Sequence, residues 1–161
     1  MPDLEPVDVD FADRARHVVR VERIVDAAPA AIWDVIIDTS SWTDWFPTMS
    51  RADSPAQHAT LGSARTVKVG PLVADETVVV ADAPSRWGFT VTRTNLPMAK
   101  QILELLELED VSSDHPRTRV TYIGAFEPFW FNRPLFGMVK RNAANAWRHG
   151  LDGLASHVAT R

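Results

Sequence analysis

The chain has 161 residues, a net charge of −4, 45% hydrophobic residues and 24% charged residues, which fits one globular domain with a single core. It contains no cysteine, which excludes disulfides, thiolate metal sites and a thiol nucleophile. The negative charge argues against a nucleic-acid surface, and no apolar run reaches the roughly 18 residues that stable membrane insertion requires.

Residues 1–16 are interpreted as an N-terminal extension, and residues 17–161 as one domain. The extension is acidic and has no apolar core, so it differs from a secretory signal, and we expect a cytoplasmic protein. Residues 17–27 are predicted to form the first strand, with Val19 and Val21 on one face.

Two short helices are predicted after this strand. Residues 29–38 show helical spacing of apolar residues behind an N-terminal proline. Residues 39–47 form a second helix or turn, and their closely spaced aromatic rings require a buried environment. These rings belong to Trp42, Trp45 and Phe46.

Alternation of apolar and polar residues then predicts a series of antiparallel strands. The predicted strands cover residues 62–69, 72–82, 86–94, 101–111 and 118–126. The clearest alternation lies in the third of these, where one face carries Trp87, Phe89, Val91 and Arg93. Residues 96–109 are rich in strong helix formers, but the flanking strands and turns favour a strand.

Residues 134–159 are predicted to form a long final helix, with Asn132 as its cap and Pro134 in its first turn. At about 1.5 Å per residue the helix would be roughly 40 Å long, so its apolar stripe needs a curved sheet to cover it. The stripe consists of Phe136, Val139, Ala143, Trp147, Gly150, Leu151, Leu154 and Val158.

Three stretches carry a family resemblance, and they occur in a characteristic order. They are VERIVDAAPAAIWDVIIDTSSWTDWFP at 21–47, VVVADAPSRWGFTV at 78–91 and TRVTYIGAFEP at 118–128. Together they resemble the START/Bet v 1-like (SRPBCC) superfamily, in particular its bacterial polyketide cyclase/dehydrase and lipid-transport group.

This resemblance implies an α+β helix-grip fold. A curved antiparallel β-sheet of about six to seven strands would wrap around the long C-terminal helix, with two short helices after strand 1. It also implies a cavity between the sheet, the long helix and the short helices.

Familiar catalytic motifs do not occur in the chain. It has no GxSxG elbow, no P-loop and no dinucleotide fingerprint. None of the five histidines lies four residues from another, so we expect no metal site and no cofactor.

Four charged side chains lie on otherwise apolar faces, where a charge without a partner is very costly. They are Glu76, Arg93, Glu104 and Lys140. Each either reaches solvent at the end of its element or lines a wet cavity, and Arg93 is the first candidate for a ligand contact. Tyr122 either points its hydroxyl at a ligand carbonyl or is an ordinary core residue with its own hydrogen bond.

The predicted ligand-binding set combines these groups with aromatic and apolar residues of the strands and the final helix. It comprises Trp45, Phe46, Glu76, Trp87, Phe89, Val91, Arg93, Glu104, Tyr122, Phe126, Trp130, Phe136, Val139, Lys140 and Ala143.

Three functions remain open from the sequence. The first is binding of a small hydrophobic or amphipathic ligand (lipid, polyketide or isoprenoid-like) in an internal cavity. The second is a polyketide cyclase or dehydratase, which needs a proton donor and acceptor across the cavity. The third is a chaperone-associated or dimerising interaction module. The expected partner is a small hydrophobic ligand and not nucleic acid, and the chain is expected to be a monomer or homodimer.

Overall fold

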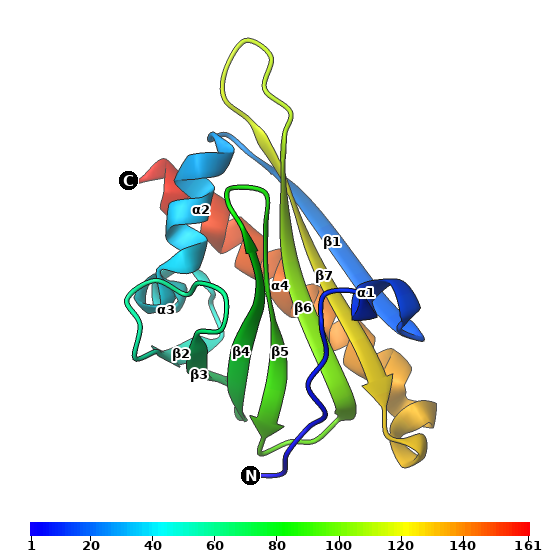
Figure 1. The fold of residues 1–161 in the computed structure, drawn as a ribbon. Helices are drawn as coiled ribbons and strands as arrows, with labels where there is room; N and C mark the ends of the chain where they lie inside the picture. Colours follow the sequence, from blue (N-terminus) through cyan, green and yellow to red (C-terminus); the bar gives the residue numbers. More distant parts are fainter.

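The computed structural model describes residues 1–161, and a seven-stranded antiparallel sheet dominates it. The strands lie in the order β1-β7-β6-β5-β4-β3-β2, and the sheet curls around helix α4 (Figure 1). The elements are α1 (Phe11–Arg14), β1 (His17–Val25), α2 (Pro29–Ile37), η1 (Thr39–Ser41), α3 (Trp42–Trp45), β2 (Met49–Asp53), β3 (Ala64–Val69), β4 (Leu72–Asp82), β5 (Arg86–Thr94), β6 (Ala99–Asp110), β7 (Thr118–Pro128), η2 (Trp130–Leu135) and α4 (Phe136–Ala159). This arrangement confirms the predicted α+β helix-grip fold.

Most of residues 96–109, the segment rich in helix formers, belongs to strand β6, which pairs with β7 along its length. Ile102 and Leu106 of β6 belong to the main core, whereas Leu103 and Leu105 belong to a smaller cluster on the convex face of the sheet. Burial on both faces stabilises the strand and overrides the helix propensity of its residues.

Two β-bulges change which face of the sheet a residue occupies. In β4 the extra residue is Val79, and Val80 belongs to the convex cluster. In β5 the extra residue is Thr92, and Arg93 lies on the outside beside Asp3. An extra residue reverses the alternation of every side chain beyond it, so the simple period-2 pattern fails at both places.

The N-terminal extension fills a gap in the sheet between β5 and β6. β5 and β6 pair only as far as Thr90 and Leu103, and residues 2–5 lie between the diverging strands beyond that point (Figure 1). Residues 2–5 form three backbone hydrogen bonds to the two strands. The amide of Leu4 donates to Thr92 O (2.8 Å), the amide of Glu5 donates to Lys100 O (2.9 Å), and Pro2 O accepts from the amide of Thr94 (3.1 Å). The extension then covers the convex face with Val7 and Phe11, which are both buried.

Helix α4 approaches its neighbours closely where it or they carry glycine. A Cβ atom at Gly153 would lie 1.8 Å from the carbonyl oxygen of Trp45, so α4 touches the backbone of α3. A Cβ atom at Gly124 of β7 would lie 2.1 Å from the ring of Trp147. These contacts fix the helix against α3 at one end and against the centre of the sheet.

The start of α4 differs from the prediction. The helix begins at Phe136 rather than at Pro134, which lies inside the preceding 3-10 helix η2. Asn132 does not cap it; its Nδ2 donates a 3.0 Å hydrogen bond to the carbonyl oxygen of Met98. This bond ties η2 to the turn between β5 and β6. The short elements β2 and α1 were not predicted.

Candidate functional site

A cavity of about 270 Å³ lies between the concave face of the sheet and α4. Hydrophobic residues supply 18 of its 23 lining residues, so the space suits an apolar ligand with few polar contacts. The predicted residues that line it are Phe46, Glu76, Phe89, Val91, Glu104, Tyr122, Phe126, Val139 and Ala143.

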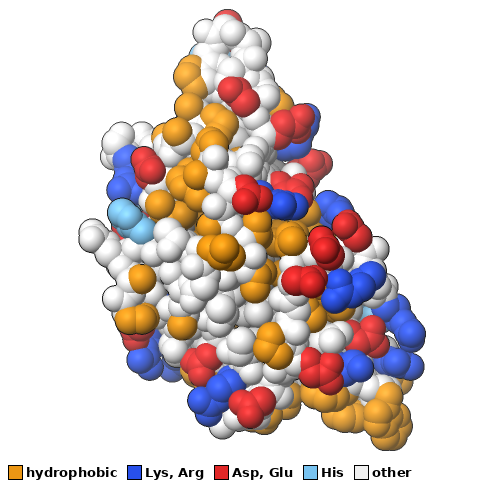
Figure 2. Space-filling view, in the orientation of Figure 1, with side chains coloured by type: hydrophobic (Ala, Val, Ile, Leu, Met, Phe, Trp, Pro, Cys, Tyr) orange, Lys and Arg blue, Asp and Glu red, His pale blue; other side chains and the backbone are white.

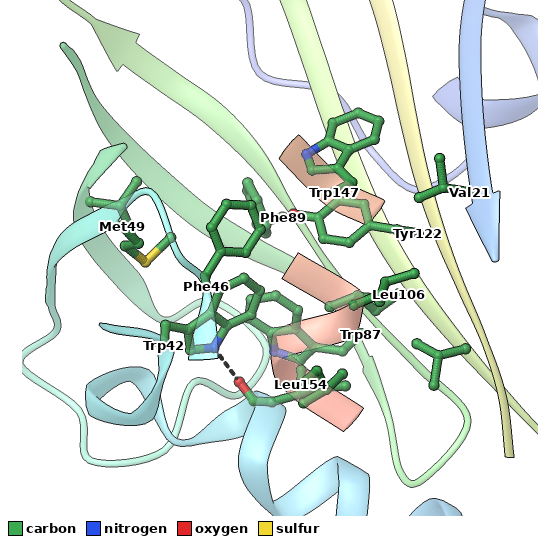
Figure 3. Close-up of a cluster of buried hydrophobic side chains, with 14 of the residues drawn as sticks. Val21, Trp42, Phe46, Met49, Trp87, Phe89, Leu106, Tyr122, Trp147 and Leu154 are labelled. Carbon is green, nitrogen blue, oxygen red and sulfur yellow. Dashed lines mark hydrogen bonds between the residues drawn. The ribbon is translucent and has the colours of Figure 1, made fainter. Parts of the chain in front are cut away.

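Aromatic rings from α3, β5, β7 and α4 cluster between the sheet and the helices (Figure 3). Trp147 of α4 stacks on Tyr122 of β7, with ring centroids 4.7 Å apart. Trp42 of α3 lies 5.5 Å from Trp87 of β5, and its Nε1 donates a 2.8 Å hydrogen bond to the carbonyl oxygen of Ile36. The indole N–H of Trp42 is therefore satisfied within the protein, and its ring remains available as an apolar wall.

Arg65 is the main polar group of the cavity, and the sequence prediction missed it. Its side chain is 1% exposed, and its Cζ lies 4.2 Å from the ring centroid of Trp42, 4.8 Å from that of Trp87 and 4.6 Å from that of Phe89. Its Nε donates a 2.5 Å hydrogen bond to Oε2 of Glu76, whereas its Nη1 has no partner. Arginine stays protonated in proteins, so the cavity contains a permanent cation with an unused N–H donor.

A second polar pair lies next to this ion pair. The hydroxyl of Tyr122 donates a 2.6 Å hydrogen bond to Oε2 of Glu104. Burial and the neighbouring carboxylate of Glu76 raise the pKa of Glu104 to about 7, against the opposing effects of the Tyr122 bond and the Arg65 charge. Burial also raises the pKa of Glu76, although Arg65 opposes that shift. The Glu104 carboxyl therefore exchanges its proton near neutral pH.

The cavity opens at the end of the sheet. Its exposed lining residues are Leu96 and Met98 of the β5–β6 turn and Asn142 of α4. Arg65 lies instead in the interior, where its guanidinium contacts the rings of Trp42, Trp87 and Phe89. A bound molecule would thus direct its polar end inward and its apolar end toward the opening.

Arg93 does not line the cavity, contrary to the expectation that it continues the row of Trp87, Phe89 and Val91. The bulge at Thr92 turns its side chain to the convex face. There its Nε lies 3.4 Å from Asp3 and its Nη1 3.7 Å from Asp75.

Five other predicted residues also lie outside the cavity lining. Trp45, Trp87 and Phe136 are buried in the core beside it. Lys140 is half-buried on α4, and Trp130 is 78% exposed in η2. Trp130 therefore projects away from the core and does not supply the predicted aromatic contact in the cavity.

Several lining residues were absent from the prediction. They are Trp42, Met49, Arg65, Val67, Val69, Leu72, Ala74, Thr94, Leu96, Met98, Ile102, Asn142, Ala146 and Trp147. Alternation with Val67 and Val69 in the predicted strand 62–69 could have identified Arg65, because the same signal singled out Glu76. No group of three or more histidine, aspartate or glutamate side chains is placed to hold a metal ion.

Comparison with known proteins agrees with this architecture. The family described as polyketide cyclase / dehydrase and lipid transport matches residues 16–159. A START superfamily protein from Mycobacterium smegmatis is 15% identical with a TM-score of 0.70, and the match covers 89% of this chain and 98% of that one. A protein from Thermus thermophilus is 17% identical with a TM-score of 0.71, over 89% and 98% of the two chains.

A third similar structure comes from Thermobifida fusca, at 22% identity and a TM-score of 0.67, over 89% of this chain and 93% of that one. At these identities the likeness concerns the fold alone. No curated protein matches the chain. None of its helices combines the length and the apolar composition needed to cross a bilayer.

Proposed function

This chain belongs to the polyketide cyclase/dehydrase and lipid-transport family, and from that premise we propose that it binds a small amphipathic molecule in the cavity under its sheet. The observation that carries the proposal is the buried Nη1 of Arg65, which has no hydrogen-bond partner in a cavity lined mainly by hydrophobic residues. A buried donor without an acceptor is unfavourable, and a ligand oxygen would supply the acceptor.

The size of the cavity limits the ligand. A cavity of about 150 Å³ holds benzene, so 270 Å³ fits about two fused rings or a chain of roughly ten carbons. A longer chain would extend past Leu96 and Met98 into the opening. Each buried methylene contributes about 0.8 kcal/mol, so ten of them provide about 8 kcal/mol before ordering costs, which limits affinity to the micromolar range.

The charges favour an oxygen-bearing end group. Arg65 offers an N–H donor, and Glu104 offers an O–H donor or an acceptor according to its protonation. A carboxylic acid, a ketone or a hydroxyl can satisfy both groups. A hydrocarbon without oxygen would leave Nη1 of Arg65 unpaired and should bind more weakly than the matching acid, by about tenfold for one hydrogen bond to a charged group.

Displacement of a fluorescent fatty-acid probe tests the proposal. The competitors are acids, methyl esters and hydrocarbons of matched chain length. Ala143→Trp fills the cavity and should abolish probe binding, whereas Ala31→Trp on the exposed side of α2 should not change it. Equal probe affinity in both variants would place the ligand elsewhere and overturn the proposal.

A second function, a cyclase or dehydratase, is favoured by one specific observation. The Glu104 carboxyl has a pKa of about 7 and is held by the Tyr122 hydroxyl, as general acid–base catalysis requires. Glu104→Gln preserves size and hydrogen bonding. Under this function the variant keeps its affinity for a polyketone substrate and loses turnover, whereas a pure carrier shows no turnover in either form.

A further inference from the structure

The end of the molecule that contains the cavity opening carries a projecting apolar patch. Figure 2 shows hydrophobic side chains gathered over η2 and the start of α4. We define the end patch by its exposed residues, which are Leu96, Met98, Trp130, Phe131, Leu135 and Met138. Exposed residues of this size are common singly, but a group of six at one end indicates a binding surface.

The end patch continues directly into the cavity. Leu96 and Met98 belong both to the patch and to the cavity lining. Asn132 of η2 donates hydrogen bonds to the carbonyl oxygens of Pro97 (3.4 Å) and Met98 (3.0 Å), so the two parts of the patch are joined. A surface that touches the patch therefore also faces the opening.

Basic residues occur in the same elements as the patch, with Arg133 in η2 and Lys140 in α4. Burial lowers the pKa of His17, and the charges of Lys140, Arg16 and Arg133 lower it further against the effect of Glu127, so these three cations lie near the same histidine. Arg16 and Lys140 have no acidic partner, and Arg133 lies 3.5 Å from Glu127. Although the chain as a whole is acidic, this end carries free positive charge.

Three of the five acidic residues of the N-terminal extension have partners of their own, since Asp8 lies 3.3 Å from Arg14 and two others are engaged on the convex face. Asp3 lies beside Arg93, and Glu5 accepts a 2.9 Å hydrogen bond from Gln101, both on the convex face of the sheet. The η2 and α4 part of the patch thus has basic side chains next to its apolar ones.

We propose that the end patch docks reversibly onto the surface of an anionic lipid bilayer, with the cavity opening turned toward the lipid. This inference rests on the proposed ligand-binding function, because it identifies where the ligand would enter. Tryptophan and phenylalanine at the tip suit the headgroup region of a membrane, and the cations match anionic lipid. No spanning segment is needed, since an exposed apolar group with a basic border is sufficient for peripheral binding.

A second copy of the chain is a poorer occupant of the same surface. In a two-fold dimer the same patch faces itself, so the interface would gather Arg16 and Lys140 of both copies and double its unpaired positive charge. Like charges without partners oppose such an interface. An anionic bilayer removes that opposition.

Flotation with vesicles tests the proposal. We expect the full chain to bind phosphatidylcholine vesicles that contain about 30% phosphatidylglycerol, and to bind pure phosphatidylcholine at least about fivefold more weakly, because each cation near an anionic surface contributes about fivefold. Binding should weaken as salt increases.

Matched variants separate the apolar and the charged contributions. Leu135→Ala removes a residue that is 62% exposed in the patch, and Leu61→Ala removes one that is 69% exposed elsewhere. Leu135→Ala should lower vesicle partition by about fivefold, and Trp130→Ala with Phe131→Ala by more than about tenfold, whereas Leu61→Ala should have no effect. Arg16→Gln should lower binding to anionic vesicles by about fivefold, and Lys68→Gln should not.

Two outcomes overturn the docking proposal. One is equal vesicle partition for the wild-type chain and the Trp130→Ala/Phe131→Ala variant. The other is a dimer in sedimentation that this variant dissolves, with no vesicle binding by either. Probe binding in solution reports the cavity separately: if the patch variant binds the probe normally but neither protein binds vesicles, docking fails and the ligand-binding function stands.

Discussion

The Tyr122 hydroxyl donates a 2.6 Å hydrogen bond to Oε2 of Glu104, and the Tyr122 ring stacks on Trp147 of α4. One residue of β7 thus orients a carboxyl group of β6 and at the same time supports the helix across the cavity. Substitutions at Tyr122 and Glu104 should therefore affect the protonation and ligand contacts of the cavity. Substitutions elsewhere should affect the stability of the fold around the cavity.

Glu104 should make stability depend on pH near neutrality. The folded protein holds the Glu104 proton up to about pH 7, whereas the unfolded chain releases it near its ordinary pKa of 4.5. The folded state therefore binds more protons between these values, and the free energy of unfolding falls as pH rises, by about 3 kcal/mol in total. Urea unfolding at several pH values should show this fall in the wild-type chain and its absence in Glu104→Gln. The same slope in both would show that another group is responsible.

Breaking the buried ion pair should be costly. Arg65→Met leaves the Glu76 carboxyl buried without its partner and should lower the free energy of unfolding by about 3 to 5 kcal/mol. Arg65→Met combined with Glu76→Leu removes both charges and should recover much of this loss. Arg93→Met breaks only exposed pairs and should cost about 1 kcal/mol or less. Urea unfolding of the four proteins tests the coupling, and equal losses for Arg65→Met and Arg93→Met would contradict it.

The contact between α4 and α3 depends on the lack of a side chain at Gly153. Gly153→Ala would place a Cβ 1.8 Å from the carbonyl oxygen of Trp45 and should destabilise the protein by about 1 to 3 kcal/mol. Gly137 lies in the same helix, and a Cβ added there would have no atom within 4 Å, so Gly137→Ala should stabilise the protein by about 0.5 to 1 kcal/mol. Thermal unfolding should therefore shift in opposite directions for the two variants. A gain in both would mean that α3 moves aside freely.

The N-terminal extension should protect the amides of β5. The Thr94 amide donates to the carbonyl oxygen of Pro2, so deletion of residues 1–5 removes its acceptor. Hydrogen exchange at Thr94 should then accelerate by about tenfold or more, because the lost bond leaves the amide open to solvent. Exchange at Ile123, in the middle of β7, serves as the control and should not change. Unchanged exchange at Thr94 would show that the extension is not bound to the sheet in solution.

Much of the fold followed from periodicity alone. The apolar stripe of the last helix and the alternation in the strands predicted one long helix and an antiparallel sheet, and β4 and β5 have the predicted bounds. These patterns are local and survive folding because one face of each element is buried. β2 was missed because only one of its five residues, Met49, is buried, which leaves little pattern to detect.

The site was less predictable because it depends on pairing between strands. Nothing local marks the bulge at Thr92, yet it moves Arg93 to the outside and ends the apolar row at Val91. Arg65 occupies the place that Arg93 was expected to fill, and its partner Glu76 lies on the neighbouring strand. Register across β3 and β4 is needed to recognise that ion pair, and a single strand does not reveal it.

The insertion of residues 2–5 between β5 and β6 also bears on how the chain avoids aggregation. Without these residues, the parts of β5 and β6 beyond Thr90 and Leu103 would present unpaired amide and carbonyl groups to solvent. Such edges recruit strands from other molecules. Because residues 2–5 occupy the space between β5 and β6, these strand edges are not available for pairing with another molecule.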